Sequence, residues 1–201
     1  MLDQGLTLCR ASGYRASLST LAAGLGQAYA FQGRLAEGYA LVEEAIRDDS
    51  RTGGLQASAS RVARLSEVCR LAGRGEEAGQ YACQALDLAR QLKERGSEAQ
   101  ALYQLGAAQA YTDPSDTAQA ETHYRQALAL AEELGMRPLA AHYHAGLGTL
   151  YTTTGRWEQA RTALTAAMAL YRAMAMMFWL PQTEAALAQV PHATGSLGGS
   201  H

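Results

Sequence analysis

A pattern of small and large residues recurs four times along this 201-residue chain, with a period near 40 residues. In the last copy its members are Leu147, Gly148, Tyr151, Gly155, Ala160, Leu164 and Ala167. The final small residues of the four copies stand at positions 45, 85, 127 and 167, at intervals of 40, 42 and 40 residues. Such self-similarity is typical of solenoids, in which every copy is one structural unit that packs on its neighbour.

Within each copy, apolar residues follow the 3.6-residue period of an α-helix twice. In the last copy the first stripe is Tyr143, Leu147, Leu150 and Tyr151, and the second is Trp157, Ala160, Leu164, Ala167, Met168 and Tyr171. Helix-forming Ala, Leu, Gln, Glu and Arg fill most of the chain, which has only 4 Pro. We therefore expect an all-α protein in which these stripes form the cores of successive helical hairpins.

Small residues predict where the two helices of a hairpin approach each other. The equivalent position of the first helix is Gly26, Ser66, Gly106 or Gly148, and the second helix offers Ala78, Ala120 or Ala160. Because a small side chain leaves room for the facing backbone, we expect close helix–helix contact at these positions.

Glycines also predict helix ends. First helices are expected to end at Gly33, Gly73 and Gly155, and a second helix at Gly135, in the left-handed cap conformation. Pro138 suits the first turn of the helix that follows. The pair Gly96-Ser97, with Glu98 after it, predicts a helix stop and a new N-cap.

The pattern predicts helices at residues 2–12, 16–32, 35–49, 55–72, 75–94, 98–112, 116–134, 138–154, 157–174 and 177–190. We expect one solenoid domain over residues 1–190, with repeats at about 16–50, 55–95, 97–135 and 138–175 and a capping helix at 177–190. Residues 2–12 have the pattern of a second helix, so we expect the chain to begin inside a longer array. The Gly- and Ser-rich tail 191–201 is expected to be disordered, and its end also fits a vector-derived extension.

The L-G-x2-Y and A-x3-Leu spacings resemble those of tetratricopeptide repeats over nearly the whole chain. This resemblance implies a right-handed α-α superhelix of about four long repeats, with a partial N-terminal helix and a C-terminal cap. A narrower resemblance rests on Leu134-Gly135-Met136-Arg137-Pro138, Leu147-Gly148, Tyr151, Gly155, Gln159-Ala160-Arg161, Tyr171-Arg172 and Phe178-Trp179-Leu180. This stretch is similar to the C-terminal repeat region of bacterial signalling proteins in which a nucleotide-cyclase domain and a STAND-type ATPase domain precede the repeats. It implies a sensor or scaffold segment that regulates such domains.

Composition disfavours several other classes of protein. The 17 basic and 19 acidic residues are interspersed, unlike the basic stripe of a nucleic-acid surface, and no stretch approaches the roughly 20 apolar residues of a membrane span. Cys9, Cys69 and Cys83 form no C-x-x-C pair, and no signal-peptide pattern opens the chain, so we expect reduced thiols and a cytoplasmic protein. His142 and His144 point apart on a helix, and no phosphate loop is present. We expect neither an enzyme nor a metal or cofactor site.

The first helix of each repeat is expected to line a groove that holds a protein or peptide partner, or other domains of the parent protein. Projecting the repeat frame assigns the following residues to it: Gln27, Phe31, Arg64, Glu67, Arg70, Tyr103, Gln104, Tyr111, His142 and Thr149. Arg64, Arg70 and Tyr103 are the strongest candidates, because Arg and Tyr carry much of the binding energy of interfaces. The alternative for each residue is an ordinary solvated helix face. At the level of the whole chain, the alternatives are a self-association module and a small-molecule sensor with an enclosed groove.

Overall fold

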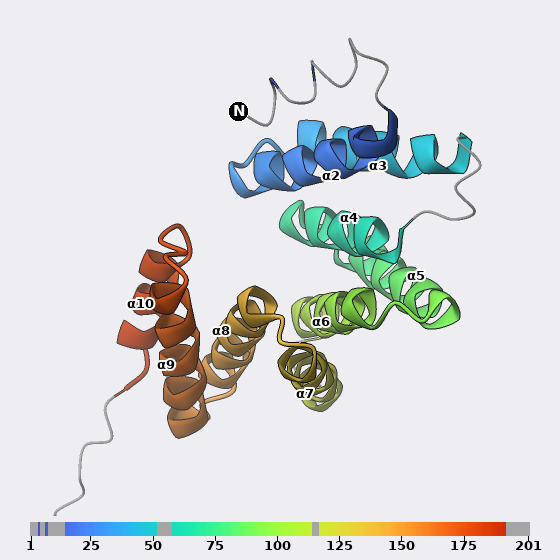
Figure 1. Cartoon of the computed structure of the whole chain (residues 1–201). Coiled ribbons are helices and arrows are strands. Elements are labelled where there is room, and N and C mark those ends of the chain that lie inside the picture. The colour runs from blue at the N-terminus through green and yellow to red at the C-terminus, as the bar shows by residue number, and fades with distance from the viewer. Residues whose placement is uncertain (1–3, 5–6, 8–14, 52–57, 114–116, 192–201) are drawn as a thin grey trace, which may run out of the picture. The chain divides into compact units, whose positions relative to one another are not determined.

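The computed structural model describes residues 4, 7, 15–51, 58–113 and 117–191, and its elements within them are helices (Figure 1). Their bounds are α2 (Arg15–Phe31), α3 (Leu35–Arg51), α4 (Ala59–Leu71), α5 (Gly75–Leu92), α6 (Arg95–Thr112), α7 (Thr117–Glu133), α8 (Arg137–Thr153), α9 (Trp157–Ala173) and α10 (Leu180–Ala188). The helices predicted from residue 16 onward are confirmed, with ends shifted by a few residues. Most of the helix predicted at 2–12, and nearly all of the tail, lie outside the described residues.

The chain divides into two units, residues 1–136 with α2 to α7 and residues 137–201 with α8 to α10. In unit 1 the hairpins α2–α3, α4–α5 and α6–α7 follow one another. Their first helices also contact each other, α2 with α4 and α4 with α6, so that α2, α4 and α6 form one layer. One core cluster draws Val42, Leu65, Val68, Cys69 and Ala108 from successive helices, which is the continuous core expected of stacked hairpins.

The two helices of a hairpin approach closely at the predicted small residues. A Cβ atom added to Gly26 would lie 2.7 Å from the Gly38 carbonyl oxygen, and one on Gly106 would lie 2.9 Å from the Ala120 carbonyl oxygen. Ser66 is tolerated at the equivalent position because its hydroxyl donates a hydrogen bond to the facing Ala78 carbonyl at 2.7 Å. The second copy thus adds a hydrogen bond between its two helices at this position.

Four glycines end helices as predicted, whereas the end predicted at Gly96 is wrong. Gly33, Gly73, Gly135 and Gly155 have φ angles of 81°, 77°, 66° and 70°. Helix α5, however, ends at Leu92, and Lys93 takes the left-handed conformation with φ 57°. Helix α6 begins at Arg95, which places Gly96 and Ser97 in its first turn. Gly96 packs against Met136, since a Cβ there would lie 3.3 Å from Met136 Cε.

In three of the hairpin turns, the arginine directly after the cap glycine stabilises the turn. The sequence patterns did not predict these contacts. Each arginine binds the side chain three residues ahead through Nε and stacks on a tyrosine ring. The pairs are Arg34 with Glu37 at 2.9 Å, Arg74 with Glu77 at 2.7 Å and Arg156 with Gln159 at 2.6 Å, and the rings are those of Tyr29, Tyr39 and Tyr151. These contacts fix the angle at which the second helix leaves the turn.

In unit 2 the α8–α9 hairpin is covered by α10, as the capping-helix prediction requires. Leu180 is buried against Met168 and Tyr171, and Arg172 Nη2 binds Glu184 Oε1 at 2.7 Å. The core prediction for Trp157 is wrong, because its side chain is 41% exposed. As the first residue of α9 it lies beside the turn glycine Gly155 instead of against the facing helix.

Candidate functional site

Four of the residues predicted to line the groove form one polar network in the first-helix layer of unit 1. Gln27 Nε2 on α2 donates to Glu67 Oε2 on α4 at 2.5 Å, and Gln27 Oε1 accepts a hydrogen bond from Arg64. Arg70 Nη2 lies 3.8 Å from Glu67 Oε1. We call Gln27, Arg64, Glu67 and Arg70 the first-helix cluster. It joins two successive repeats through polar side chains.

The first-helix cluster contains more positive than negative charge, with two arginines and one glutamate. Glu67 is only 9% exposed, so its carboxylate is held in a largely dry site. Burial lowers the pKa of Arg64, and the nearby Glu67 carboxylate offsets this only in part. Arg70 Nε is buried and has no hydrogen-bond partner among the described residues. Two guanidinium groups therefore share one carboxylate.

Tyr103 and Gln104 extend this surface onto α6. Tyr103 packs against Tyr124 with ring centroids 5.2 Å apart. Burial raises the pKa of Tyr103 to about 12, against the opposing effect of the positive charge on Arg70. Gln104 is buried, and its Oε1 lacks a hydrogen-bond partner within the described part of the chain. Because buried polar groups are nearly always paired, this amide marks a place where a further polar group would be stabilised.

The other two residues predicted in unit 1 lie at helix ends. Phe31 is half-buried at the last residue of α2. Tyr111 is exposed near the end of α6 and covers the α4–α5 turn, since a Cβ on Gly75 would lie 2.7 Å from Tyr111 Cδ1. Tyr111 thus has a packing role in addition to any role in binding.

His142 and Thr149 belong to unit 2, so the ten predicted residues are divided between the two units. His142 lies between Tyr171 and Trp179, with 2.7 Å between its Nδ1 and the Tyr171 hydroxyl and 4.7 Å between its ring centroid and that of Trp179. Burial lowers the pKa of His142 to about 4, which keeps the ring neutral near pH 7. Thr149 is exposed and donates to the Ala145 carbonyl of its own helix at 3.0 Å.

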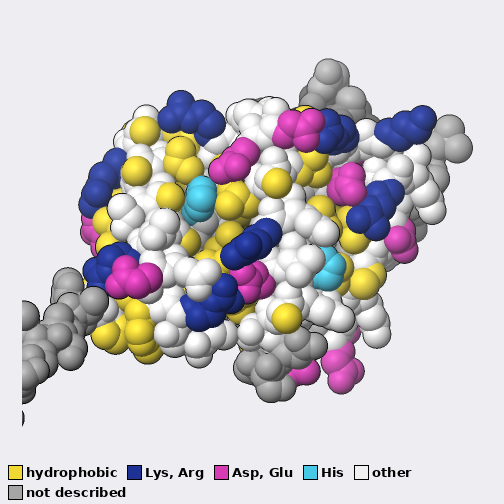
Figure 2. Space-filling view, turned by 90° about the horizontal axis from the view of Figure 1, so that it is seen from below, with side chains coloured by type: hydrophobic (Ala, Val, Ile, Leu, Met, Phe, Trp, Pro, Cys, Tyr) yellow, Lys and Arg dark blue, Asp and Glu magenta, His cyan; other side chains and the backbone are white. Residues whose placement is uncertain are grey.

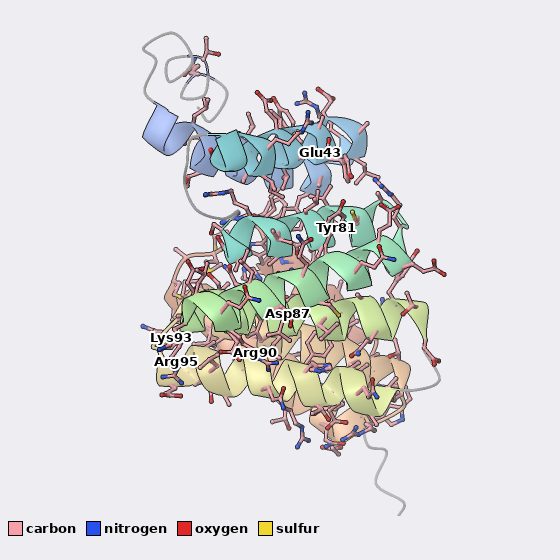
Figure 3. The ribbon with its side chains drawn as sticks, turned by 90° about the vertical axis from the view of Figure 1, so that its right-hand side faces the viewer. Glu43, Tyr81, Asp87, Arg90, Lys93 and Arg95 are labelled. Atoms are coloured by element: carbon pink, nitrogen blue, oxygen red, sulfur yellow. The ribbon has the colours of Figure 1, made fainter. Side chains whose placement is uncertain are left out.

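Charge in unit 1 is segregated between the two helix layers, which sequence reasoning overlooked. Helices α2, α4 and α6 carry five basic and two acidic residues, whereas α3, α5 and α7 carry four basic and eleven acidic residues. Figure 3 views the side on which α3 and α5 lie and labels two of these acids, Glu43 and Asp87. Sorting the charges by helix type within the repeat would have shown this difference.

The described residues show few features of other kinds of site. No group of three or more His, Cys, Asp or Glu side chains among them is placed to hold a metal ion. None of the described helices combines the length and the apolar character needed to span a bilayer. On the face seen in Figure 2, basic and acidic side chains are intermingled. Cys69 and Cys83 are free thiols, and Cys9 lies outside the described residues.

Comparison with known proteins gives a family match over part of the chain and similar solved structures. Residues 108–173 match the family model of the tetratricopeptide repeat. Among solved structures, BtubC (BKLC) from P. vanneervenii superposes with a TM-score of 0.58 at 21% identity, over 80% of this chain and 65% of that chain. The apo form of RapI gives 0.59 at 16% identity, over 94% and 53%. A putative kinesin light chain with TPR-like repeats from Podosopora anserina gives 0.56 at 17% identity, over 86% and 93%. No curated protein matches the chain.

These similarities confirm the predicted all-α tetratricopeptide fold class. The chain spans less than two thirds of the BtubC and RapI chains. Solenoid repeats stack into extended surfaces of the kind that proteins use for binding.

Proposed function

We propose that this chain is a non-catalytic scaffold that binds a protein or peptide segment across the first-helix layer of unit 1. The observation that carries the proposal is the first-helix cluster, which gathers Gln27, Arg64, Glu67 and Arg70 from successive repeats. Tyr103 and Gln104 continue it on α6. Arginine and tyrosine beside partly buried polar groups are the residues from which interfaces draw most of their energy.

The narrower resemblance of residues 134–180 supports a cellular context for this scaffold. We place it in a cytoplasmic bacterial signalling protein, where it would regulate nucleotide-cyclase and ATPase domains. Its partner would be another protein or one of those domains.

Site-specific photocrosslinking tests which layer meets the partner. A photoreactive amino acid at Ser60 on α4 should give adducts in cells, and mass spectrometry should identify the protein or domain captured. The matched control carries the same group at Gln84, which is exposed on the second helix α5. Adducts from position 84 alone would contradict the proposal.

Self-association is a second candidate, favoured by an exposed apolar pair in unit 2. Met177 and Phe178 precede α10 and are 62% and 59% exposed, and Phe178 packs edge-on against Trp179. Apolar surface of this kind is often covered by another protein surface. Light scattering at high micromolar concentration tests this candidate, because a strict monomer would exclude it.

A further inference from the structure

We infer that the first-helix layer of unit 1 holds an acidic segment of its partner, with Arg64 and Arg70 contacting the partner's carboxylates. This inference rests on the proposed function and adds the chemical class of the partner.

Charged side chains recur at a regular spacing on α4. Arg61, Arg64, Glu67 and Arg70 stand at every third residue, so each is a neighbour of the next on the helix surface, and Glu67 lies between Arg64 and Arg70. The neighbouring first helices α2 and α6 contribute one carboxylate, Glu98, and that group binds Arg90 of α5 at 3.0 Å. Glu67 is therefore the carboxylate of α4 that is a neighbour of both Arg64 and Arg70.

Glu67 does not satisfy the hydrogen-bonding groups of the two arginines of the first-helix cluster. Its contact with Arg70 is long, at 3.8 Å, and Arg70 Nε is buried without an acceptor in the described structure. Arg64 is hydrogen-bonded to the neutral amide of Gln27, and burial disfavours its charged form. A guanidinium group removed from water is stabilised by an anion, and a carboxylate can accept two of its hydrogen bonds at once. A carboxylate from a partner would stabilise the charge of these guanidinium groups and accept their hydrogen bonds.

The distribution of charge around α4 favours an acidic protein segment over a nucleic acid. A phosphate backbone needs an extended basic footprint, whereas here Arg64 and Arg70 belong to a single helix. The second helices α3, α5 and α7 carry eleven acidic residues, and the whole chain has a net charge of −2. A short acidic peptide can contact Arg64 and Arg70 on α4 without lying along the acidic second helices.

Fluorescence anisotropy on the full chain tests the inference with a labelled peptide of alternating Glu and Ala. The controls are the same peptide with Gln in place of Glu and a single-stranded oligonucleotide of equal length. We expect the Glu peptide to bind at least tenfold more tightly than the Gln peptide, with an affinity that falls as salt is added. Arg64→Gln and Arg70→Gln should each weaken binding about tenfold. Arg125→Gln, which removes an exposed arginine from α7, should leave binding unchanged.

Glu67→Gln separates recognition from a merely structural role. Because this variant removes the internal carboxylate that competes for Arg70, it should bind the Glu peptide several-fold more tightly; circular dichroism would show that all variants keep their helices. Equal affinity for the Glu and Gln peptides, weaker binding by Glu67→Gln, or tighter binding of the oligonucleotide would each overturn the inference. If adducts still formed at position 60 in any of these cases, the scaffold function would stand and the acidic partner alone would be excluded.

Discussion

At the scale of single residues, Gly24 and Gly26 on α2 show how position decides what a glycine does. A Cβ on Gly26 would lie 2.7 Å from the Gly38 carbonyl oxygen, whereas a Cβ on Gly24 would meet nothing within 4 Å. We expect Gly26→Ala to lower the free energy of unfolding by about 1–3 kcal/mol through overpacking. Gly24→Ala should raise it by about 0.5–1 kcal/mol, because Ala loses less backbone entropy in a helix. Urea unfolding followed by circular dichroism would measure both, and equal effects would contradict the packing argument.

The two described cysteines should differ sharply in reactivity. Cys69 is fully buried in the unit 1 core, and burial raises the pKa of its thiol to about 11, whereas Cys83 is exposed on α5. Since the thiolate is the reactive form, we expect Cys83 to react with a thiol reagent within minutes and Cys69 only after unfolding. The experiment uses a Cys9→Ser background, with Cys83→Ser as the control that should lose the fast phase. A fast phase that survives in the control would contradict the burial of Cys69.

His142 should make unit 2 less stable in mild acid. Its folded-state pKa of about 4 lies below the roughly 6.5 of an unfolded histidine, so between these values the unfolded chain binds a proton that the folded chain does not. Stability should therefore fall as the pH drops from about 6.5 to 4, by at most about 1.4 kcal/mol per pH unit. His142→Phe keeps a ring beside Trp179 and removes the titration. The unfolding midpoint of the variant should vary less with pH than that of the wild type. The same pH dependence in both proteins would contradict the prediction.

At the scale of helices, the α5–α6 junction achieves a left-handed turn without glycine. Lys93 has φ 57°, a conformation that costs a residue with a Cβ about 1–2 kcal/mol. We expect Lys93→Gly to stabilise unit 1 by about 0.5–1 kcal/mol, because the relief of strain exceeds the added entropy of the unfolded chain. Lys93→Ala removes the same charge and keeps the strain, so it should give no such gain. Thermal unfolding of the three proteins compares them directly.

The helices and most of their ends could be predicted because their causes are local in sequence. Gly33 and Gly73 end helices through their own conformational freedom, which a single residue reveals. Gly96 was misread because its cause is tertiary: Met136, 40 residues away, packs against it. Trp157 was misread because the apolar stripe continues into the first turn of α9, where its side chain lies beside Gly155 and is 41% exposed.

The candidate site shows the same division between local and tertiary causes. The repeat frame predicted which face would carry Gln27, Glu67 and the arginines, since Gln27 and Glu67 occupy equivalent positions one period apart. It did not predict that these side chains would bind each other, because pairing depends on the rotamers and spacing of neighbouring helices. His142 was assigned to the same face, yet the residues before α10 enclose its ring.

At the scale of the whole molecule, the two units have separate cores, and each core is assembled from neighbouring helices. The core around Val68 lies within unit 1, and the core around Tyr171 lies within unit 2. In repeat proteins stability is roughly a sum of nearest-neighbour terms, so damage to one core should remain near it. This property distinguishes a solenoid from a protein with a single central core.

Hydrogen exchange measured by mass spectrometry can show this locality. Tyr171→Ala should destabilise its surroundings by about 3–5 kcal/mol, since it removes a buried ring and its hydrogen bond to His142. We expect faster amide exchange in α8, α9 and α10 and unchanged exchange in α4 and α5. Val68→Ala, which empties a fully buried site in unit 1, should give the opposite pattern. Loss of protection throughout both units in either variant would contradict this expectation. It would mean that the two units unfold together, because the coupling between them exceeds the stability of either core.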